Sequence, residues 1–218
     1  MDDGGEPREA REALNPSDSF ESVVRSRRMT RSFDATRPVP VDMIEHLVGL
    51  AARAPSAGKT QGWHVVVLEG GQTAEFWDIT LPQERRQGFA WPGLLAAPVI
   101  LLPLADPQAY LDRYSETDKA ATGWGDDVGA WSAPYWTIDT SMAIMTLLLA
   151  AHDSGLGTLF FAVSRNEQVL RERLGIPARL DLLGAIAIGY AQQDVVRPGR
   201  SAPRRRRSAE EIIHRGRW

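Results

Sequence analysis

The sequence is most distinctive at Ala54-Pro55-Ser56-Ala57-Gly58-Lys59-Thr60-Gln61-Gly62-Trp63, which runs directly into His64-Val65-Val66-Val67-Leu68. The first segment, which we call the signature loop (residues 54–63), is rich in small residues, proline and glycine. Few side chains stand in the way of its backbone, so its N–H and C=O groups can approach a ligand closely. The second segment is rich in β-branched residues, which is typical of a buried strand. The sequence therefore predicts a ligand-contacting loop that leads into a strand.

A basic segment precedes this loop, Ser26-Arg27-Arg28-Met29-Thr30-Arg31-Ser32-Phe33. Its arginines lie where a predicted helix ends, and a guanidinium fork matches phosphate oxygens well. On spacing alone, a solvated helix end whose cations complement the helix dipole is the better interpretation. A second basic cluster occurs at Arg197, Arg200 and Arg204-Arg205-Arg206-Arg207. Alone, it could equally be a solvated tail or a nonspecific contact for nucleic acid or membrane.

Composition narrows the function classes. The chain of 218 residues has no Cys, which excludes disulfides, a thiolate metal site and a Cys nucleophile. A net charge of −3 argues against nucleic-acid binding over the whole surface. The longest apolar run, residues 142–151, is far shorter than the ~20 residues that span a bilayer. The acidic N-terminus does not resemble a signal peptide. We therefore expect a cytoplasmic protein with no membrane or nucleic-acid partner.

The hydrophobic periodicity, together with the capping and breaking residues, predicts the helices and strands. We expect residues 1–16 to be a disordered leader and residues 17–218 to form one domain, with 191–218 as a C-terminal arm. Asp18, Asp42 and Asn166 are the expected N-caps of three helices. The predicted helices span residues 18–27, 42–54, 73–79, 137–154 and 166–174, and the predicted strands span 63–68, 98–104, 158–163 and 182–189. The second strand has a proline near each end, which suits strand ends better than a central ladder.

Two further segments carry functional expectations. The helix at 137–154 is apolar almost all round, which predicts burial on several sides and, in a chain this small, burial against a second subunit. Residues 105–136 show no sustained period, and we expect them to form a lid or insertion, because long irregular stretches are usually functional or mobile. The four His residues, at positions 46, 64, 152 and 214, have no metal-ligand spacing, so we expect no metal.

Taken in order, the motifs resemble those of the FMN-dependent nitroreductase family. The basic segment is similar to the family's Arg-Arg-Ser-x-Arg-x-Phe, and the signature loop to its Ala-Pro-Ser-x-x-Asn-x-Gln-Pro-Trp. Ala151-His152-Asp153-Ser154-Gly155-Leu156-Gly157 resembles the end of the family's long helix, and Ile188-Gly189-Tyr190 the end of a following strand. A basic pair, a Glu pair and a terminal Trp close the chain, as they do in the family. The resemblance covers roughly residues 20–218.

The resemblance implies an α+β sandwich, in which helices flank a mixed, mainly antiparallel sheet, and a homodimer with two FMN sites at the subunit interface. The residues that it implies for FMN are Arg27, Arg28, Met29, Arg31, Pro55, Ser56, Ala57, Lys59, Gln61, Ala162, Val163, Arg205 and Arg207. The arginines would clamp the phosphate, with the register of the last pair open within the four-Arg run. The signature loop would follow the ribityl chain and pyrimidine edge, and the backbone of Ala162 and Val163 would approach N5.

Three residues depart from the family pattern. Met29 replaces a Ser, and Gly62 replaces a Pro at a position where the change is expected to be minor. Lys59 replaces an Asn that usually bonds to the isoalloxazine edge. A cation near N1 would stabilise the anionic reduced flavin and raise its potential. Alternatively, Lys59 points to solvent and the contact is lost.

The implied activity is NAD(P)H-driven, ping-pong, two-electron reduction of nitroaromatic, quinone or related small acceptors. Protons can come from solvent, so no catalytic side chain is expected. Trp124, Trp131, Tyr135 and Trp136 could form a lid over the substrate, or they could pack the dimer surface. The alternatives on the same scaffold are an FMN-dependent dehydrogenase or oxidase, a dehalogenase, an enzyme that fragments its own flavin, and a protein that binds flavin without turnover.

Overall fold

The computed structural model describes residues 20–192, 199 and 201–218. Its main elements are α1 (Phe20–Ser26), α2 (Val41–Ala51), β1 (Trp63–Glu69), α3 (Gly71–Thr80), β2 (Val99–Ala105), α4 (Pro107–Ser115), α5 (Tyr135–Asp153), β3 (Gly157–Phe161), α6 (Glu167–Leu174), β4 (Asp181–Leu182) and β5 (Ala185–Gly189). A short 3₁₀ turn, η2 (Ala57–Lys59), lies in the signature loop, and η4 (Pro92–Ala96) precedes β2. The expected leader, 1–16, and the expected cap Asp18 lie outside the described residues.

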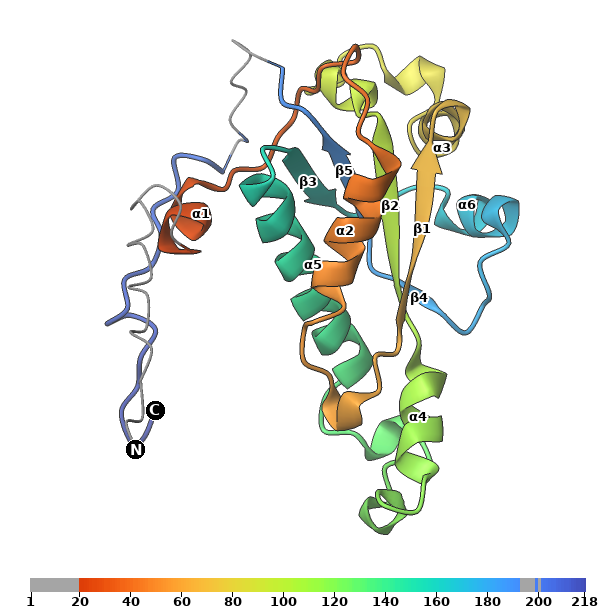
Figure 1. Cartoon of the computed structure of the whole chain (residues 1–218), viewed down its shortest axis with the longest axis vertical. Coiled ribbons are helices and arrows are strands. Elements are labelled where there is room, and N and C mark those ends of the chain that lie inside the picture. Colours follow the sequence, from red (N-terminus) through yellow and green to blue (C-terminus); the bar gives the residue numbers. More distant parts are fainter. Residues whose placement is uncertain (1–19, 193–198, 200) are drawn as a thin grey trace, which may run out of the picture.

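The strands form one antiparallel sheet in the order β1-β2-β5-β3, and β4 pairs with the end of β2. The sheet is sandwiched between helices (Figure 1), with α2 and α5 on one face and α3 and α6 on the other. The predicted α+β class, with a mainly antiparallel sheet flanked by helices, is confirmed.

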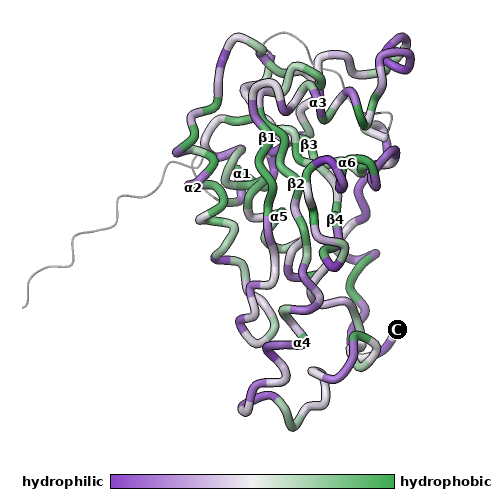
Figure 2. The backbone as a smooth tube through the Cα atoms, turned by 90° about the vertical axis from the view of Figure 1, so that its right-hand side faces the viewer, coloured by the Kyte–Doolittle hydropathy of each residue, from purple (hydrophilic) through white to green (hydrophobic). Residues whose placement is uncertain are grey.

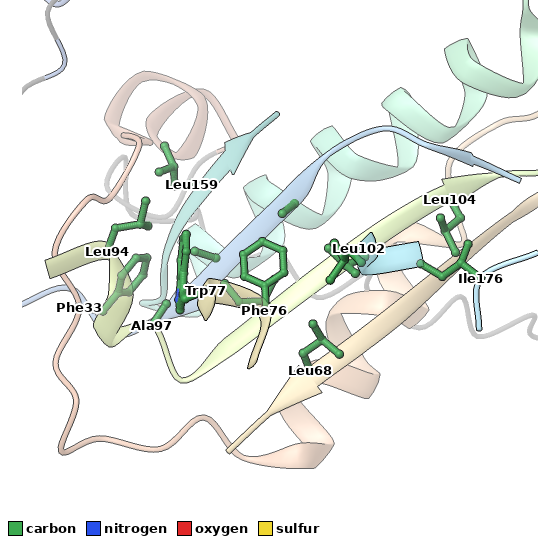
Figure 3. Packing of buried hydrophobic residues seen from close by; sticks show 14 of the residues in the cluster. Phe33, Leu68, Phe76, Trp77, Leu94, Ala97, Leu102, Leu104, Leu159 and Ile176 are labelled. Atoms are coloured by element: carbon green, nitrogen blue, oxygen red, sulfur yellow. The ribbon is translucent and has the colours of Figure 1, made fainter. Parts of the chain in front are cut away.

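The alternation of side chains along β2 builds the core on both faces of the sheet. Ile100, Leu102 and Leu104 join the cluster under α3 and α6, where Phe76 and Trp77 also lie (Figure 3). Val99 and Leu101, which alternate with them, belong to the cluster on the opposite face, with residues of α2 and α5. Because both faces are covered, the strand is an uninterrupted apolar run rather than an alternating one. Figure 2 shows hydrophobic residues following β1, β2 and α5, and hydrophilic residues following α6 and the outer loops.

Pro103 lies inside the central strand β2, so the expectation that the prolines mark strand ends is wrong at this position. The Pro103 carbonyl accepts from the Leu183 N–H at 3.1 Å. In an antiparallel strand the N–H and C=O of one residue face the same neighbouring strand, so the nitrogen of Pro103, which has no hydrogen, also faces the side of β2 where Leu183 lies. That neighbour changes here, because β5 pairs with β2 only through Leu101 and β4 pairs only from Leu104. The proline therefore falls at a break in the ladder, where the sheet does not need its donor.

Three other local expectations need correction. The second helix begins at Val41, and Pro40 rather than Asp42 is its N-cap, because the Pro40 carbonyl already accepts from the Met43 N–H at 3.1 Å. The predicted strand 182–189 is split at Gly184, whose φ of 140° separates β4 from β5, so that the two short strands pair with β2 at different places. Asn166 does occupy the N-cap of α6, but its side chain donates to the Ile79 carbonyl at 2.8 Å instead of capping the helix.

Residues 105–136, which were expected to be irregular, contain the helix α4, and a side-chain N-cap begins it. The Asp106 carboxylate accepts from the Gln108 N–H at 3.1 Å, and Pro107 stands at the first helical position. Two buried tyrosines, Tyr110 and Tyr114, sit one turn apart on its inner face. Such a short helix gives a weak periodic signal, which is why the sequence pattern missed it.

The helix α1 and the chain end stand apart from the sandwich (Figure 1). Residues 201–218 are exposed almost throughout, and Trp218 is 97% exposed in the single chain. The helix α5 also exposes apolar side chains to solvent, Ile138 at 40% and Met145 at 42% exposure. Among the described residues, no helix has the length and apolarity to cross a membrane.

Candidate functional site

Arg27 is the centre of a cationic cluster at the end of α1. Its side chain is half-buried, and its Nη1 has no hydrogen-bond partner among the described residues. Burial, then the charges of Arg206 and Arg28, lower the pKa of Arg27. A buried guanidinium nitrogen that faces other cations rather than an acceptor is costly. The arrangement is therefore suited to an anion, which would satisfy the orphaned donor and neutralise the cluster.

Met29 and Arg31 are held against the edge strand β3. Met29 forms a parallel bridge with Thr158, and the Thr30 N–H donates to the Thr158 carbonyl at 2.8 Å. The Arg31 guanidinium donates to the Met29 carbonyl at 3.1 Å and lies 5.3 Å from the ring centre of Trp91. The basic segment is thus fixed by backbone bonds to β3, and Nη1 of Arg27 is left without a partner.

The chain end contributes Arg206 to this cluster within one chain. Arg205 instead donates to both carboxylate oxygens of Glu211, at 2.7 and 2.6 Å. That pairing raises the pKa of Arg205 and lowers the pKa of Glu211 to about 2. Arg207 contacts the Glu211 carbonyl. Of the four-Arg run, the structure therefore places Arg206 beside Arg27, whereas Arg205 and Arg207, the predicted pair, hold the turn of the arm.

The signature loop is a compact turn with three residues in the left-handed region. Gly58, Lys59 and Gln61 have φ values of 60°, 55° and 54°. The Ser56 hydroxyl accepts from the Gln61 N–H at 3.0 Å, and the Ala57 N–H donates to the Asp139 carboxylate on α5 at 2.8 Å.

The outward side of the loop is polar and accessible. Pro55, Lys59 and Gln61 are exposed, and Lys59 has no ion-pair partner in the described part of the chain. Its ammonium is therefore available either to a ligand or to solvent, and both interpretations of this substitution stay open.

The two predicted halves of the site lie near opposite ends of α5. At the C-terminal end, Ser26 of α1 and His152 of α5 are hydrogen-bonded at 2.8 Å. Towards the N-terminal end, Asp139 holds the signature loop. Thirteen helical residues separate Asp139 from His152, which is about 20 Å at 1.5 Å per residue. One chain therefore does not bring the loop and the arginine cluster together.

A cavity of about 380 Å³ adjoins the arginine side of the site. Ala162 and Val163, which the sequence suggested for the flavin N5 region, lie on its wall. Most of the remaining wall is apolar or aromatic, contributed by Phe76, Trp77, Leu81, Phe89, Trp91, Leu94, Leu159 and Phe161. Trp91 lines the cavity and also lies under Arg31, so the cavity and the cationic cluster are neighbours. Such walls suit a planar ring system.

The sequence reasoning missed these aromatic wall residues. Trp77 stacks on Phe161 at 5.7 Å with 6° between the ring planes, and Phe89 meets Trp91 edge-on at 6.0 Å. The aromatic residues at positions 76–77 and at positions 89 and 91 can be seen in the sequence. They come from elements far apart in sequence, so only the fold shows that they share a cavity.

The four aromatic residues proposed for a lid form a packed cluster with α4. Trp131 and Trp136 are buried, and the Trp131 ring lies 4.7 Å from Tyr114 and 5.8 Å from Tyr110. Trp124 is more exposed, and its ring lies 5.0 Å from the Trp131 ring with 43° between the planes; the Tyr135 ring lies 5.5 Å from Trp131. Within one chain these rings pack against each other, and a contact with substrate stays a prediction. No cluster of three or more potential metal ligands occurs among the residues that the structure describes.

Comparison with known proteins assigns the chain to a family by sequence. The nitroreductase family model matches residues 24–190, and the chain belongs to the nitroreductase family. It is 29% identical to a 4-nitrobenzoate reductase from Nocardioides sp. over 82% of this chain and 83% of that protein. It is 27% identical to an Archaeoglobus fulgidus protein named for NADH dehydrogenase and NAD(P)H nitroreductase activities, over 79% of this chain and 85% of that one.

The fold is also found among solved structures. A nitroreductase-like protein from Streptococcus mutans superimposes with a TM-score of 0.72, over 89% of this chain and 97% of that one, at 17% identity. At this identity the likeness supports the fold. Together with the named reductases, the family assignment makes the chain an oxidoreductase.

Proposed function

We propose that the chain is an FMN-dependent NAD(P)H oxidoreductase that reduces nitroaromatic, quinone or related acceptors by two electrons in ping-pong order. The observation that carries the proposal is the orphaned donor of Arg27 within a cluster of arginines. A phosphate is the anion that such forks bind best. The names of two relatives, an NADH dehydrogenase/NAD(P)H nitroreductase and a 4-nitrobenzoate reductase, agree with this chemistry.

The residues present fit an FMN molecule. Arg27, Arg28, Arg31 and Arg206 would hold its phosphate, and the aromatic cavity beside Ala162 and Val163 has walls for a planar ring. Bound FMN would supply hydride chemistry, which no side chain of the protein can provide. The protein would orient the ring, keep water from the cavity through its apolar wall, and leave one slot for the NAD(P)H donor and the acceptor in turn. The cytoplasmic location stays a prediction.

The proposed site is completed by a second copy of the chain. The signature loop lies about 20 Å along α5 from the arginine cluster, and a two-fold partner can bring its own loop to the cluster. The exposed Ile138 and Met145 lie seven residues apart, and so on one face of α5, which suits them to an apolar dimer contact. We therefore propose a homodimer with two composite sites.

The visible spectrum of the purified protein tests the proposal. We expect one FMN per chain after incubation with FMN and desalting, and loss of the flavin absorbance on anaerobic addition of NADPH or NADH. A matched pair of variants localises the site. Arg27→Ala should lose FMN, whereas Arg25→Ala, which removes an exposed arginine paired with Glu21 at 2.7 Å, should retain it. A wild-type protein that binds no FMN would overturn the proposal.

A further inference from the structure

Asp139 is a buried carboxylate on α5 that the proposed chemistry does not use. One oxygen, Oδ2, accepts from the Ala57 N–H at 2.8 Å and from the Tyr110 hydroxyl at 2.7 Å. No cation pairs with Asp139 in the described part of the chain, and Asp139 is only 5% exposed. A buried carboxylate is costly unless its hydrogen bonds are specific. These two bonds tie the signature loop and α4 to α5 through one atom.

The loop is fastened to α4 at a second point. The Arg113 guanidinium donates to the Gly58 carbonyl at 2.9 Å, and it is itself held by both oxygens of Asp118 at 2.7 and 2.8 Å. A Cβ at Gly58 would lie 3.0 Å from the Tyr114 ring, and the φ of +60° at this position also favours glycine. The inner side of the loop therefore rests on α4, while its outer side stays exposed.

Gly62 shows why this chain departs from the family loop. A Cβ at Gly62 would lie 2.7 Å from a ring carbon of Tyr110 and 3.0 Å from Ala109. A proline at this position, which the family pattern expects, would meet the Tyr110 ring. Gly62 and Tyr110 thus fit each other, and the glycine allows the tyrosine hydroxyl to reach Asp139. Burial, followed by the bond to Asp139, raises the pKa of Tyr110, so the hydroxyl stays a donor.

We propose that Asp139 is a positioning residue, which together with Tyr110 and Gly62 locks the signature loop in the shape that contacts the flavin. The part of this inference that concerns flavin rests on the proposed function. A loop with three residues in the left-handed region has other conformations of similar energy when nothing holds it. A bond from a buried carboxylate selects one of them in advance, so that binding does not have to order the loop.

The experiment measures hydrogen exchange of the peptide covering residues 54–62 in the FMN-free protein, and FMN affinity by titration. Asp139→Ala should speed exchange at Ala57 about tenfold or more, because bonds to charged groups are among the stronger ones, and should weaken FMN binding. Asp139→Asn keeps an acceptor oxygen in place and should recover most of both properties. Asp153→Ala, at an exposed carboxylate on the same helix, is the matched control and should change neither.

Tyr110→Phe keeps the ring against Gly62 and removes only the hydroxyl, so it tests the anchor even where Asp139→Ala does not fold. It should speed loop exchange by a smaller factor than Asp139→Ala. Unchanged exchange at Ala57 in the folded Tyr110→Phe protein, with Asp139→Ala either unchanged or unfolded, would overturn the anchor. Because exchange is measured without FMN, it separates this inference from the proposed function: a protein that binds no FMN but loses loop protection in Tyr110→Phe keeps the anchor and loses only its flavin role.

Discussion

Replacing Arg27 by alanine should weaken FMN binding by about tenfold to a hundredfold. The Nη1 donor of Arg27 has no partner among the described residues, so a phosphate would satisfy it directly. A hydrogen bond to a charged group contributes about 1.5–3 kcal/mol, and each 1.4 kcal/mol is a factor of ten in affinity. The matched control is Arg25→Ala, because Arg25 lies on the same helix and its charge is engaged by Glu21.

The same substitution should not destabilise the FMN-free protein. Burial and the neighbouring charges of Arg206 and Arg28 lower the pKa of Arg27, which means that its charged form is disfavoured in the folded chain. Removing the charge should therefore leave the melting temperature of the FMN-free protein unchanged or raise it. In the presence of FMN the order should reverse, because the wild-type protein gains more stability from the ligand.

Thermal melts with and without FMN, together with a binding titration, measure both effects. Equal FMN affinity in the wild-type and Arg27→Ala proteins would remove Arg27 from the site. A lower melting temperature of the FMN-free variant would show that Arg27 is satisfied within the protein, and the argument from an orphaned donor would fail.

Four further outcomes follow from single residues. Lys59→Asn should lower the flavin midpoint potential in a dye-linked titration if the ammonium reaches the pyrimidine edge, and an unmoved potential with FMN bound means that Lys59 faces solvent. Gly62→Ala should reduce the free energy of unfolding by about 1–3 kcal/mol in urea, because its Cβ overpacks Tyr110; Gly71→Ala, with open space at the Cβ, should not. The depressed pKa of Glu211, about 2 against an ordinary 4.5, means that its stabilisation of the arm is complete above pH 4.5 and lost as the pH falls towards 2; exchange at the Ser208 amide, which donates to Glu211, should rise over that interval. Light scattering should give twice the 24.1 kDa chain mass for the wild-type protein, and Ile138→Asp should shift it towards the single chain.

The elements with strong local signals could be predicted from the sequence. The strand after the signature loop and the long helix α5 were expected within two residues of their observed bounds, because each has a clear apolar pattern and a clear breaker. Gly155 and Gly175 have φ values of 77° and 64°, as expected for glycines that end helices. The family pattern also identified a loop and an arginine segment that the structure shows to have exposed, ligand-accessible groups.

Residues that act through tertiary contacts could not be predicted in this way. Asp139 lies on a helix whose buried residues, apart from Thr140, are otherwise apolar, and nothing in its neighbours along the sequence indicates that its partners are Ala57 and Tyr110. Within one chain Arg206 lies near Arg27 and Arg205 pairs with Glu211, and motif spacing contains neither placement. The aromatic cavity needs side chains from α3, η4 and the end of β3 together.

The same limit explains why the two motif segments do not meet in one chain. Motif order along a sequence says which residues occur together in a family, but not whether one chain or two supply them to a site. Here the distance is set by α5: the loop is hydrogen-bonded to Asp139 and the basic segment to His152, and these two residues lie about 20 Å apart along the helix. A ligand held by both segments therefore needs the loop of one protomer and the arginines of another. In the proposed homodimer, a change that separates the protomers would remove the loop from the proposed site even though every side chain of the arginine cluster would stay in place.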